Sequence, residues 1–500
     1  MTIEKDIFKD LFIFEMANNH NGDLKLALKI VKAISKLQKK YGINAAVKIQ
    51  YRDMTSFVHP GFRDRTDMRQ IPRFIETDMK KDEYKQIIDA IKAEGMLSCC
   101  TPWDENSVDL CIEHDVDILK IASCGCADWP LIEKTAATKR PMVISFGAYG
   151  LSQIDKVNSF LSRRNINFAL LHCIALYPVT DMSFQLDIID KMIKRYPNAT
   201  IGYSGHEEPK NNIVCQIAAA KGASVFERHV GVPTDKVKLN AYSLNEEEME
   251  EWIKAILYVR GICRLPNEEK VILAAEKETM KVLNRGVYVN RSIKKGETIT
   301  LDDIFYAIPC AEENQMKAGE FKRNVVATKD YTENDPLLEK CERLPLEILR
   351  SAIHAVRGIL NENVIPIGDN FVVEAYHHDG MDKIFYTGAF FIDIVNREYC
   401  KRLVVLLPGQ MYPLHHHKQK EESFQVLTGD LVLNVNNKTF TLLPGELCTV
   451  LRGDMHSFYT NDGVIFEELS TTYVKNDSFY DDIEISGRDP IERKTIIKDW

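Results

Sequence analysis

Short apolar runs alternate with longer amphipathic stretches over the first half of the chain. Eight runs have the length and character of strands: residues 11–17, 45–50, 97–102, 118–123, 142–146, 168–173, 200–206 and 225–230. Stretches with apolar residues at helical spacing separate most of these runs. In residues 24–40, for example, Ile30, Ile34 and Leu37 fall on one face. This alternation predicts a (β/α)₈ barrel. A doubly wound open sheet is the alternative, but no glycine-rich dinucleotide turn follows the first run.

The pattern changes twice after the barrel. Short strand-like runs separated by turns cover residues 282–289, 293–299 and 325–331. Residues 344–360 then predict a helix with Leu349, Ile353 and Val356 on one face, and short strands dominate from there to about residue 475. We therefore expect three domains: a barrel over residues 1–278, a small α+β domain over residues 279–343 and an all-β barrel over residues 344–500.

Polar side chains stand at or near the ends of the predicted barrel strands. They are Glu15, Lys48, Thr101, Lys120, Ser123, His172, Tyr177, Ser204, His206, Glu227 and His229. The C-terminal strand ends of such a barrel form the active site. Two lysines among several hydroxyls indicate an anion site, because both groups bind phosphate oxygens. His206 and His229, on neighbouring strands, suit a divalent metal such as Mn²⁺, Zn²⁺ or Fe²⁺.

Several motifs follow one another along these runs. They are Glu15 with Asn19-His-Asn-Gly22, Ala46-Val-Lys-Ile-Gln50, Thr101-Pro102, Lys120-Ile-Ala-Ser123, His172-Cys173 with Tyr177-Pro178, Gly202-Tyr-Ser-Gly-His206 and Glu227-Arg-His229. In this order they resemble the sialic acid synthase (N-acetylneuraminate synthase) family. Enzymes of that family condense phosphoenolpyruvate with an N-acetylated hexosamine, which gives a nine-carbon ulosonic acid and phosphate.

The resemblance implies a role for each of these polar residues. Substrate binding, chiefly of phosphoenolpyruvate, falls to Lys48, Thr101, Lys120, Ser123, Ser204 and Asn19. The catalytic candidates are Glu15, Glu227 and Tyr177, and His206 and His229 are expected to bind Mn²⁺ or Mg²⁺. A metal ion polarises the acceptor aldehyde, and a carboxylate stabilises the cationic carbon that the attack leaves behind.

The chain departs from the family pattern at three single positions and in one stretch of six residues. Ala175 stands where an Asn or Ser is usual, Gly205 replaces an Asp, and residues 238–243 replace a Gly-Pro-Asp-His stretch that contacts the sugar. Ile308 replaces an Arg that reaches the acceptor. We therefore expect a changed acceptor, and the candidates are a precursor of legionaminic acid, of pseudaminic acid or of a spore-coat sugar, alongside N-acetylmannosamine.

The second domain resembles the antifreeze-like (SAF) domain that follows the barrel in sialic acid synthases. In that family the domain of one subunit caps the barrel of the other. The resemblance therefore implies a domain-swapped homodimer.

The third domain carries a histidine-rich motif. Residues 409–429 and 444–456 resemble the two cupin motifs. His415 and His417 are two apart on a predicted strand, so they share one face and His416 takes the other. With Glu422 and His456 they form a ligand set for Mn²⁺, Fe²⁺, Zn²⁺ or Ni²⁺. The alternative is a metal-free cupin or a histidine-rich surface loop. Lys418, Lys420 and Glu421 are candidate bases if the domain is an isomerase or epimerase.

Composition and charge restrict the remaining function classes. The 500 residues carry a net charge of −9, which gives no support for nucleic-acid binding. The sequence contains no run of eighteen apolar residues, so we expect no membrane span. Twelve scattered cysteines without a signal sequence predict reduced thiols in the cytoplasm.

We therefore expect a phosphoenolpyruvate-dependent synthase of 3-deoxy nonulosonic acids, whose cupin acts on or senses a related sugar. The alternatives are a catalytically altered sugar-binding regulator, a cupin isomerase or epimerase as the main activity, and a metal aldolase that uses pyruvate.

Overall fold

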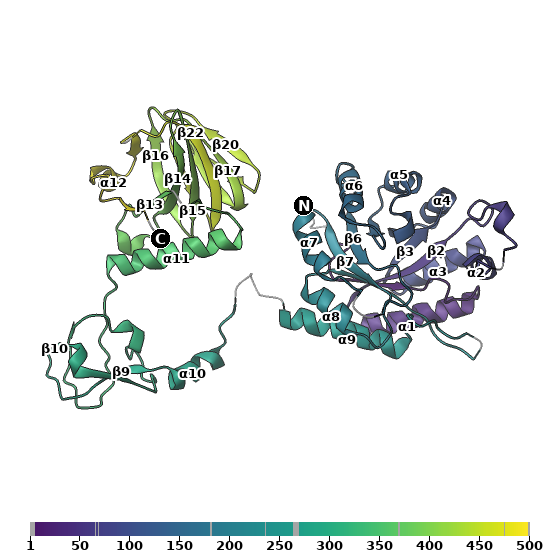
Figure 1. The fold of residues 1–500 in the computed structure, drawn as a ribbon, viewed down its shortest axis with the longest axis horizontal. Coiled ribbons are helices and arrows are strands. Elements are labelled where there is room, and N and C mark those ends of the chain that lie inside the picture. Colours follow the sequence, from purple (N-terminus) through teal and green to yellow (C-terminus); the bar gives the residue numbers. More distant parts are fainter. Residues whose placement is uncertain are drawn as a thin grey trace. The chain divides into compact units, whose positions relative to one another are not determined.

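The computed structural model describes residues 6–65, 67–68, 70–180, 183–235, 237–263, 270–368, 371–474 and 476–498. The chain forms two compact units, Met1–Val271 and Ile272–Trp500 (Figure 1). Within the described residues, no helix is long and apolar enough to cross a membrane.

The first unit is a closed barrel of parallel strands, so the predicted (β/α)₈ fold is confirmed. In the part of the chain described, its strands are β1 (Leu11–Glu15), β2 (Asn44–Tyr51), β3 (Leu97–Pro102), β4 (Ile118–Ile121), β5 (Met142–Ser145), β6 (Phe168–Cys173), β7 (Thr200–Gly205) and β8 (Val225–His229). Each strand pairs with the next in the sequence, and β8 returns to β1.

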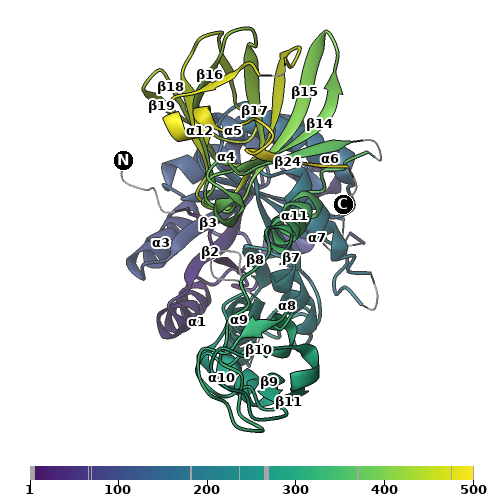
Figure 2. The same ribbon diagram turned by 90° about the vertical axis from the view of Figure 1, so that its left-hand side faces the viewer.

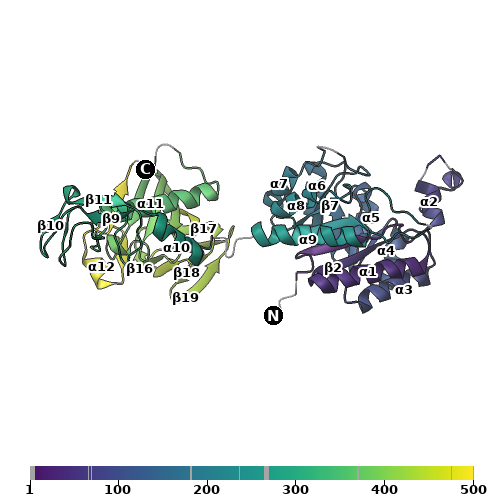
Figure 3. The ribbon, with the colours of Figure 1, turned by 90° about the horizontal axis from the view of Figure 1, so that it is seen from below.

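Helices surround these strands (Figures 1 and 3). They are α1 (Leu24–Tyr41), α2 (Gln70–Glu76), α3 (Lys81–Ala93), α4 (Glu105–Glu113), α5 (Trp129–Ala137), α6 (Leu151–Ser162), α7 (Asp187–Arg195), α8 (Ile213–Ala220) and α9 (Glu246–Cys263). Helix α1 shows how the sequence sets their limits. The side chain of Asp23 caps its first turn, and Gly42 ends it at a left-handed φ of 61°.

Apolar side chains pack against both faces of the barrel strands. One cluster, which includes Ile13, Ala46 and Leu171, lies inside the barrel, and a larger one lies between the strands and the helices. Because the strands are buried on both faces, their sequences read as continuous apolar runs. The polar residues at their C-terminal ends therefore stand out as exceptions.

The second unit begins with helix α10 (Ala274–Leu283) and a small region of short strands. These are β9 (Gly286–Val289), β10 (Thr298–Ile299), β11 (Ile304–Ala307) and β12 (Val325–Val326). They pair as β9 with β11 and β10 with β12. Val287, Ile299 and Leu337 belong to the separate apolar core of this region. The antifreeze-like character of the region stays a prediction.

The rest of the second unit is a two-sheet β-structure, as the cupin motifs predict. After helix α11 (Pro345–Glu362) come β13 (Val372–Tyr376), β14 (Ala389–Asn396), β15 (Tyr399–Leu406), β16 (Met411–His417), β17 (Glu422–Gly429), β18 (Leu431–Val435), β19 (Lys438–Leu442), β20 (Leu447–Val450), β21 (His456–Tyr459), β22 (Val464–Thr471), β23 (Ser478–Tyr480), α12 (Ile483–Gly487) and β24 (Lys494–Ile497).

The strands form two sheets, which Figure 2 shows together. One sheet has the order β20-β17-β22-β15-β14-β13-β24 and the other β19-β18-β21-β16-β23. Residues from both sheets, among them Phe391, Phe424 and Phe458, form an aromatic core. Helix α11 packs against a second apolar cluster, which includes Val373 and Ile392. This packing places β16, β17 and β21, which carry the predicted metal ligands, around one interior.

Candidate active site and metal centre

Lysine and glutamate side chains meet at the C-terminal end of the barrel strands. Strand register sets Glu15 beside both Lys48 and His229. The Lys48 ammonium forms ion pairs with Glu15 and, at 3.1 Å, with Oε1 of Glu227. Lys120 lies 3.8 Å from Oε2 of Glu227. All four side chains are almost fully buried, so two cations and two carboxylates share one water-poor site.

The two lysines sit in different electrostatic surroundings. Burial lowers the pKa of Lys48, but Glu15 and Glu227 outweigh it and hold that pKa above its usual value. Burial lowers the pKa of Lys120 as well, and Glu227 offsets this only in part. Burial raises the pKa of Glu227, but Lys120 and Lys48 bring it down to about 2. At neutral pH Glu227 is therefore ionised and lies between the two lysine side chains.

Hydroxyl groups line the same end of the barrel. The Thr101 hydroxyl is buried without a hydrogen-bond partner, whereas Ser204 donates to Glu227 over 3.1 Å. Ser123 accepts a bond from the Gly147 amide over 2.8 Å. An unpaired buried hydroxyl is costly, so Thr101 is poised to bind a polar ligand atom.

The two barrel histidines lie side by side. Their ring centroids are 5.3 Å apart, and Nδ1 of His206 lies 3.1 Å from the carbonyl oxygen of Ile174. Burial and the neighbouring His229 lower the pKa of His206 to about 3. Burial and the nearby Lys48 lower the pKa of His229 to about 3 as well. Both rings are therefore neutral near pH 7, the state that a metal ion requires of its ligands.

Other predicted site residues lie around this pair. Tyr177 packs its ring 4.2 Å from that of His206 and remains half exposed. The Asn19 amide donates to the Val230 carbonyl and the Ser243 hydroxyl, so it holds the segment after β8. The His172 ring hydrogen-bonds the carbonyl of Phe184 over 2.7 Å.

The cupin brings four metal-ligating groups together. Ligand atoms of His415, His417, Glu422 and His456 all lie within 4.8 Å of one another, and all four residues are buried. Nε2 of His456 lies 2.7 Å from Oε1 of Glu422, yet neither atom has a hydrogen-bond partner. A cation between such atoms satisfies both, so the residues fit a metal ion.

Main-chain carbonyls orient the three imidazoles. Nδ1 of His415, His417 and His456 lies 2.8–3.0 Å from the carbonyls of Pro413, Asp477 and Asp454, respectively. A donated Nδ1–H leaves Nε2 as the ligand atom, an arrangement that is typical of metal sites. His416 stacks on Phe479 on the other face of the strand, as the strand alternation predicts.

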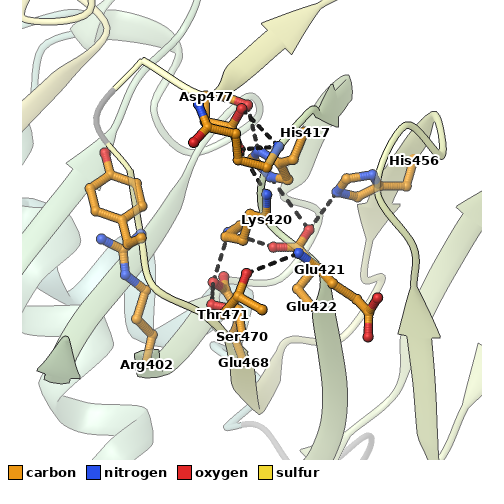
Figure 4. A network of polar contacts seen from close by, with 12 residues as sticks. Arg402, His417, Lys420, Glu421, Glu422, His456, Glu468, Ser470, Thr471 and Asp477 are labelled. Atoms are coloured by element: carbon orange, nitrogen blue, oxygen red, sulfur yellow. Dashed lines mark hydrogen bonds and ion pairs between the residues drawn. The ribbon is translucent and has the colours of Figure 1, made fainter. Parts of the chain in front are cut away.

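Asp477 holds the loop that joins the histidine pair to Glu422. Its carboxylate accepts hydrogen bonds from the amides of Lys418, Gln419 and Lys420 (Figure 4). The Lys420 side chain is buried, and its ammonium lies 2.5 Å from Glu422 and 2.8 Å from Glu468. Of the three base candidates in the sequence, Lys420 alone is buried beside the ligand set, while Lys418 and Glu421 are exposed.

Comparisons with known proteins agree with both parts of this description. The NeuB family model matches residues 35–263, and a cupin domain model matches residues 402–466. A solved structure from Chromobacterium violaceum, described as spore coat polysaccharide biosynthesis protein E, is 35% identical with a TM-score of 0.63, and the match covers 66% of this chain and 98% of that one. The chain belongs to the NeuB family.

Curated relatives lie in the same family. N-acetylneuraminate-9-phosphate synthase of Mus musculus is 29% identical over 302 residues, which are 58% of this chain and 80% of the mouse protein. N,N'-diacetyllegionaminic acid synthase of Campylobacter jejuni is 26% identical, and the match covers 66% of this chain and 99% of that synthase. The predicted family and the predicted cupin are thus confirmed.

Gly205, which stands where the family usually has an Asp, lies beside the carboxylate of Glu207 in this NeuB-family chain. A Cβ atom added at Gly205 would lie 2.7 Å from Oε1 of Glu207 and closer still to Oε2. That carboxylate pairs with Arg228 and accepts a hydrogen bond from the Tyr203 hydroxyl. A carboxylate therefore still lies beside position 205, although the sequence supplies it from two residues further along.

Several residues of these sites are not predicted from the sequence. Ser145 ends β5 and accepts a 2.7 Å hydrogen bond from Lys120. Tyr242, in the stretch that departs from the family pattern, packs its ring 5.1 Å from that of His229. Glu468 faces the cupin interior from β22. Glu468 is two residues from Phe466 and two from Ser470, so all three share one face of β22. This two-residue spacing is the signal in the sequence that could have identified it.

Proposed function

We propose that the barrel condenses phosphoenolpyruvate with the aldehyde of an amino sugar and releases a 3-deoxy nonulosonic acid and phosphate. The observation that carries the proposal is the buried cluster of Lys48 and Lys120 with Glu15 and Glu227, beside two neutral histidines. The named activities of the NeuB-family relatives support the same reaction.

The residues divide the work according to charge. Lys48, Lys120 and the hydroxyls of Thr101, Ser123, Ser145 and Ser204 bind the phosphate and carboxylate of phosphoenolpyruvate, because these are the cations and donors at the site. Asn19 keeps the segment after β8 in place, and Tyr177 forms the wall beside His206.

His206 and His229 would hold a divalent ion, Mn²⁺ or Mg²⁺, and this ion would supply electrophilic activation of the acceptor carbonyl. Carbon–carbon bond formation leaves positive character on the neighbouring carbon of phosphoenolpyruvate. Glu15 or Glu227 stabilises that charge and takes a proton from the water that adds there. Cleavage of the carbon–oxygen bond then releases phosphate.

We infer a second centre in the cupin, which holds a divalent metal ion and acts on or senses a related sugar. Its support is the four converging ligand groups. The proposal also keeps the domain division at about residues 278 and 343 and the domain-swapped dimer that the antifreeze-like resemblance implies.

The test is phosphate release from phosphoenolpyruvate with a panel of hexosamines, phosphorylated and free, read by mass spectrometry of the products. We expect one acceptor class to give equal amounts of phosphate and a product heavier by the pyruvate unit. Tight sugar binding without phosphate release would support the regulatory alternative. Product formation from pyruvate in place of phosphoenolpyruvate would support the aldolase, and isomerised hexosamine without phosphoenolpyruvate would make the cupin the main enzyme.

A further inference from the structure

The cupin pocket beside the metal ligands is rich in buried charge. His415, His417 and Glu422 line it, together with Arg402, Lys420 and Glu468. Figure 4 shows Lys420 between the carboxylates of Glu422 and Glu468. A metal centre alone needs only the first three and His456, so the additional charges call for a separate explanation.

Most of these charges pair with one another. Arg402 lies 2.7 Å from Asp393 and 3.4 Å from Glu374, and Lys494 forms an ion pair with the same Glu374. These four groups therefore balance as two cations and two carboxylates. Lys420 and Glu468, 2.8 Å apart, balance as a third pair. Among the charged side chains that line the pocket in the described residues, the one left over is Glu422, which belongs to the metal ligands.

A divalent ion changes this balance. The three imidazoles are neutral ligands, so Glu422 is the one anion in the ligand set. With the ion bound, the pocket carries one surplus positive charge where it carried one surplus negative charge before. Burial strengthens electrostatic interactions, so a buried surplus charge strongly favours a counter-ion.

The rest of the pocket wall suggests what bears that counter-ion. Phe391, Phe424 and Phe458 supply aromatic surface, and Tyr473 and Ser478 supply hydroxyls, whereas the hydroxyl of Tyr376 donates to Glu374. Aromatic rings with hydroxyl groups suit a ligand that has both C–H faces and hydroxyls. Such a ligand with a single negative charge is a sugar acid.

We propose that the metal-loaded cupin binds a monocarboxylic sugar acid, with the carboxylate at the metal side of the pocket and the Lys420–Glu468 pair beside it. The acid belongs to the chemical class that the barrel releases, and this part of the inference rests on the proposed function. The cupin then consumes or senses the product class of the barrel rather than its neutral acceptor.

Calorimetry with the full-length, Mn²⁺-loaded chain tests the proposal. The probes are N-acetylneuraminic acid, its methyl ester, which removes the charge alone, and N-acetylmannosamine. We expect the acid to bind roughly tenfold or more tightly than the ester. The cupin share is the binding that His415→Ala removes, because binding that survives in this variant belongs to the barrel. Equal affinity for acid and ester, or no cupin share at all, overturns the proposal.

Two substitutions of the same pair give opposite predictions. Lys420→Gln leaves the Glu468 charge unpaired, so acid binding should weaken by roughly tenfold, whereas Glu468→Gln leaves the lysine unpaired, so acid binding should hold or tighten. Lys418→Gln, two residues away and exposed, is the matched control. Metal content is measured for every variant. Shifts in the same direction overturn the charge account. Because phosphate release by the barrel is assayed separately, failure here leaves the proposed condensation intact.

Discussion

The barrel site and the cupin pocket both place buried lysines against buried glutamates, yet they differ in their metal ligands. In the cupin, three histidines and a glutamate converge, and each imidazole is oriented by a main-chain carbonyl. In the described part of the barrel, two histidines lie together without a third ligand group close enough to complete such a cluster. The cupin therefore presents a complete set of ligand groups, whereas the metal ion proposed for the barrel would need water or substrate oxygens as further ligands.

The difference also concerns what the lysines do. In the cupin, Lys420 neutralises carboxylates that belong to the pocket itself. In the barrel, Lys48 and Lys120 face carboxylates that are catalytic candidates. A metal ion in the barrel leaves a larger positive surplus than one in the cupin, which suits a substrate that carries a phosphate as well as a carboxylate.

The largest expected effect is that of Lys120→Ala on the barrel. Removing this ammonium leaves Glu227 without one of its two cations and phosphoenolpyruvate without a binding group. We expect kcat/KM for phosphoenolpyruvate to fall by roughly a hundredfold or more, with cupin metal content unchanged. Lys134→Ala, on the surface of α5, is the control. Unchanged kinetics in Lys120→Ala would remove the lysine from the site.

The cupin ligand set is tested by neighbouring histidines. His415→Ala removes one of four ligands and should lower cupin metal affinity by roughly a hundredfold, whereas His416→Ala, on the opposite face of β16, should change it less than about threefold. Metal titration of both full-length variants measures this. Equal losses in the two variants would mean that the strand does not present His415 to a metal.

Gly205 tests the carboxylate that replaces the usual Asp. An alanine Cβ there would collide with Glu207, so Gly205→Ala should destabilise the barrel by about 1–3 kcal/mol. A Cβ at Gly150 meets nothing within 4 Å, which makes Gly150→Ala the matched control. Denaturant unfolding monitored by barrel tryptophans is the measurement. Equal stability of the two variants would show that Glu207 moves aside freely.

The smallest expected effect belongs to Asp477, which touches no predicted ligand atom of the metal directly. Asp477→Ala removes the acceptor for the amides of the 418–420 loop and should lower cupin metal affinity by roughly tenfold. The exposed Asp462 provides the control. An affinity equal to that of Asp462→Ala would show that the loop holds its shape without the carboxylate.

Local patterns in the sequence predicted both folds and the residues that lie together in the two candidate sites. Strand ends and the two-residue spacing of His415 and His417 are local features, and the structure places those residues accordingly. Partners across the sheet are not local. Glu468 reaches Lys420 from 48 positions away, and Glu207 fills the space beside Gly205 only because the chain turns after β7. The spacing of residues in the sequence does not reveal such contacts, because they depend on how the chain folds.

The measurement that most directly tests the contrast between the two sites is a Mn²⁺ titration of the metal-free, full-length chain, followed by electron paramagnetic resonance, with and without phosphoenolpyruvate. The account predicts about one tightly bound ion per chain without phosphoenolpyruvate, lost in His415→Ala, and a second that binds tightly only when phosphoenolpyruvate is present and is lost in His206→Ala with His229→Ala. Two equally tight ions in the absence of phosphoenolpyruvate, or a tight ion that survives His415→Ala, would contradict it.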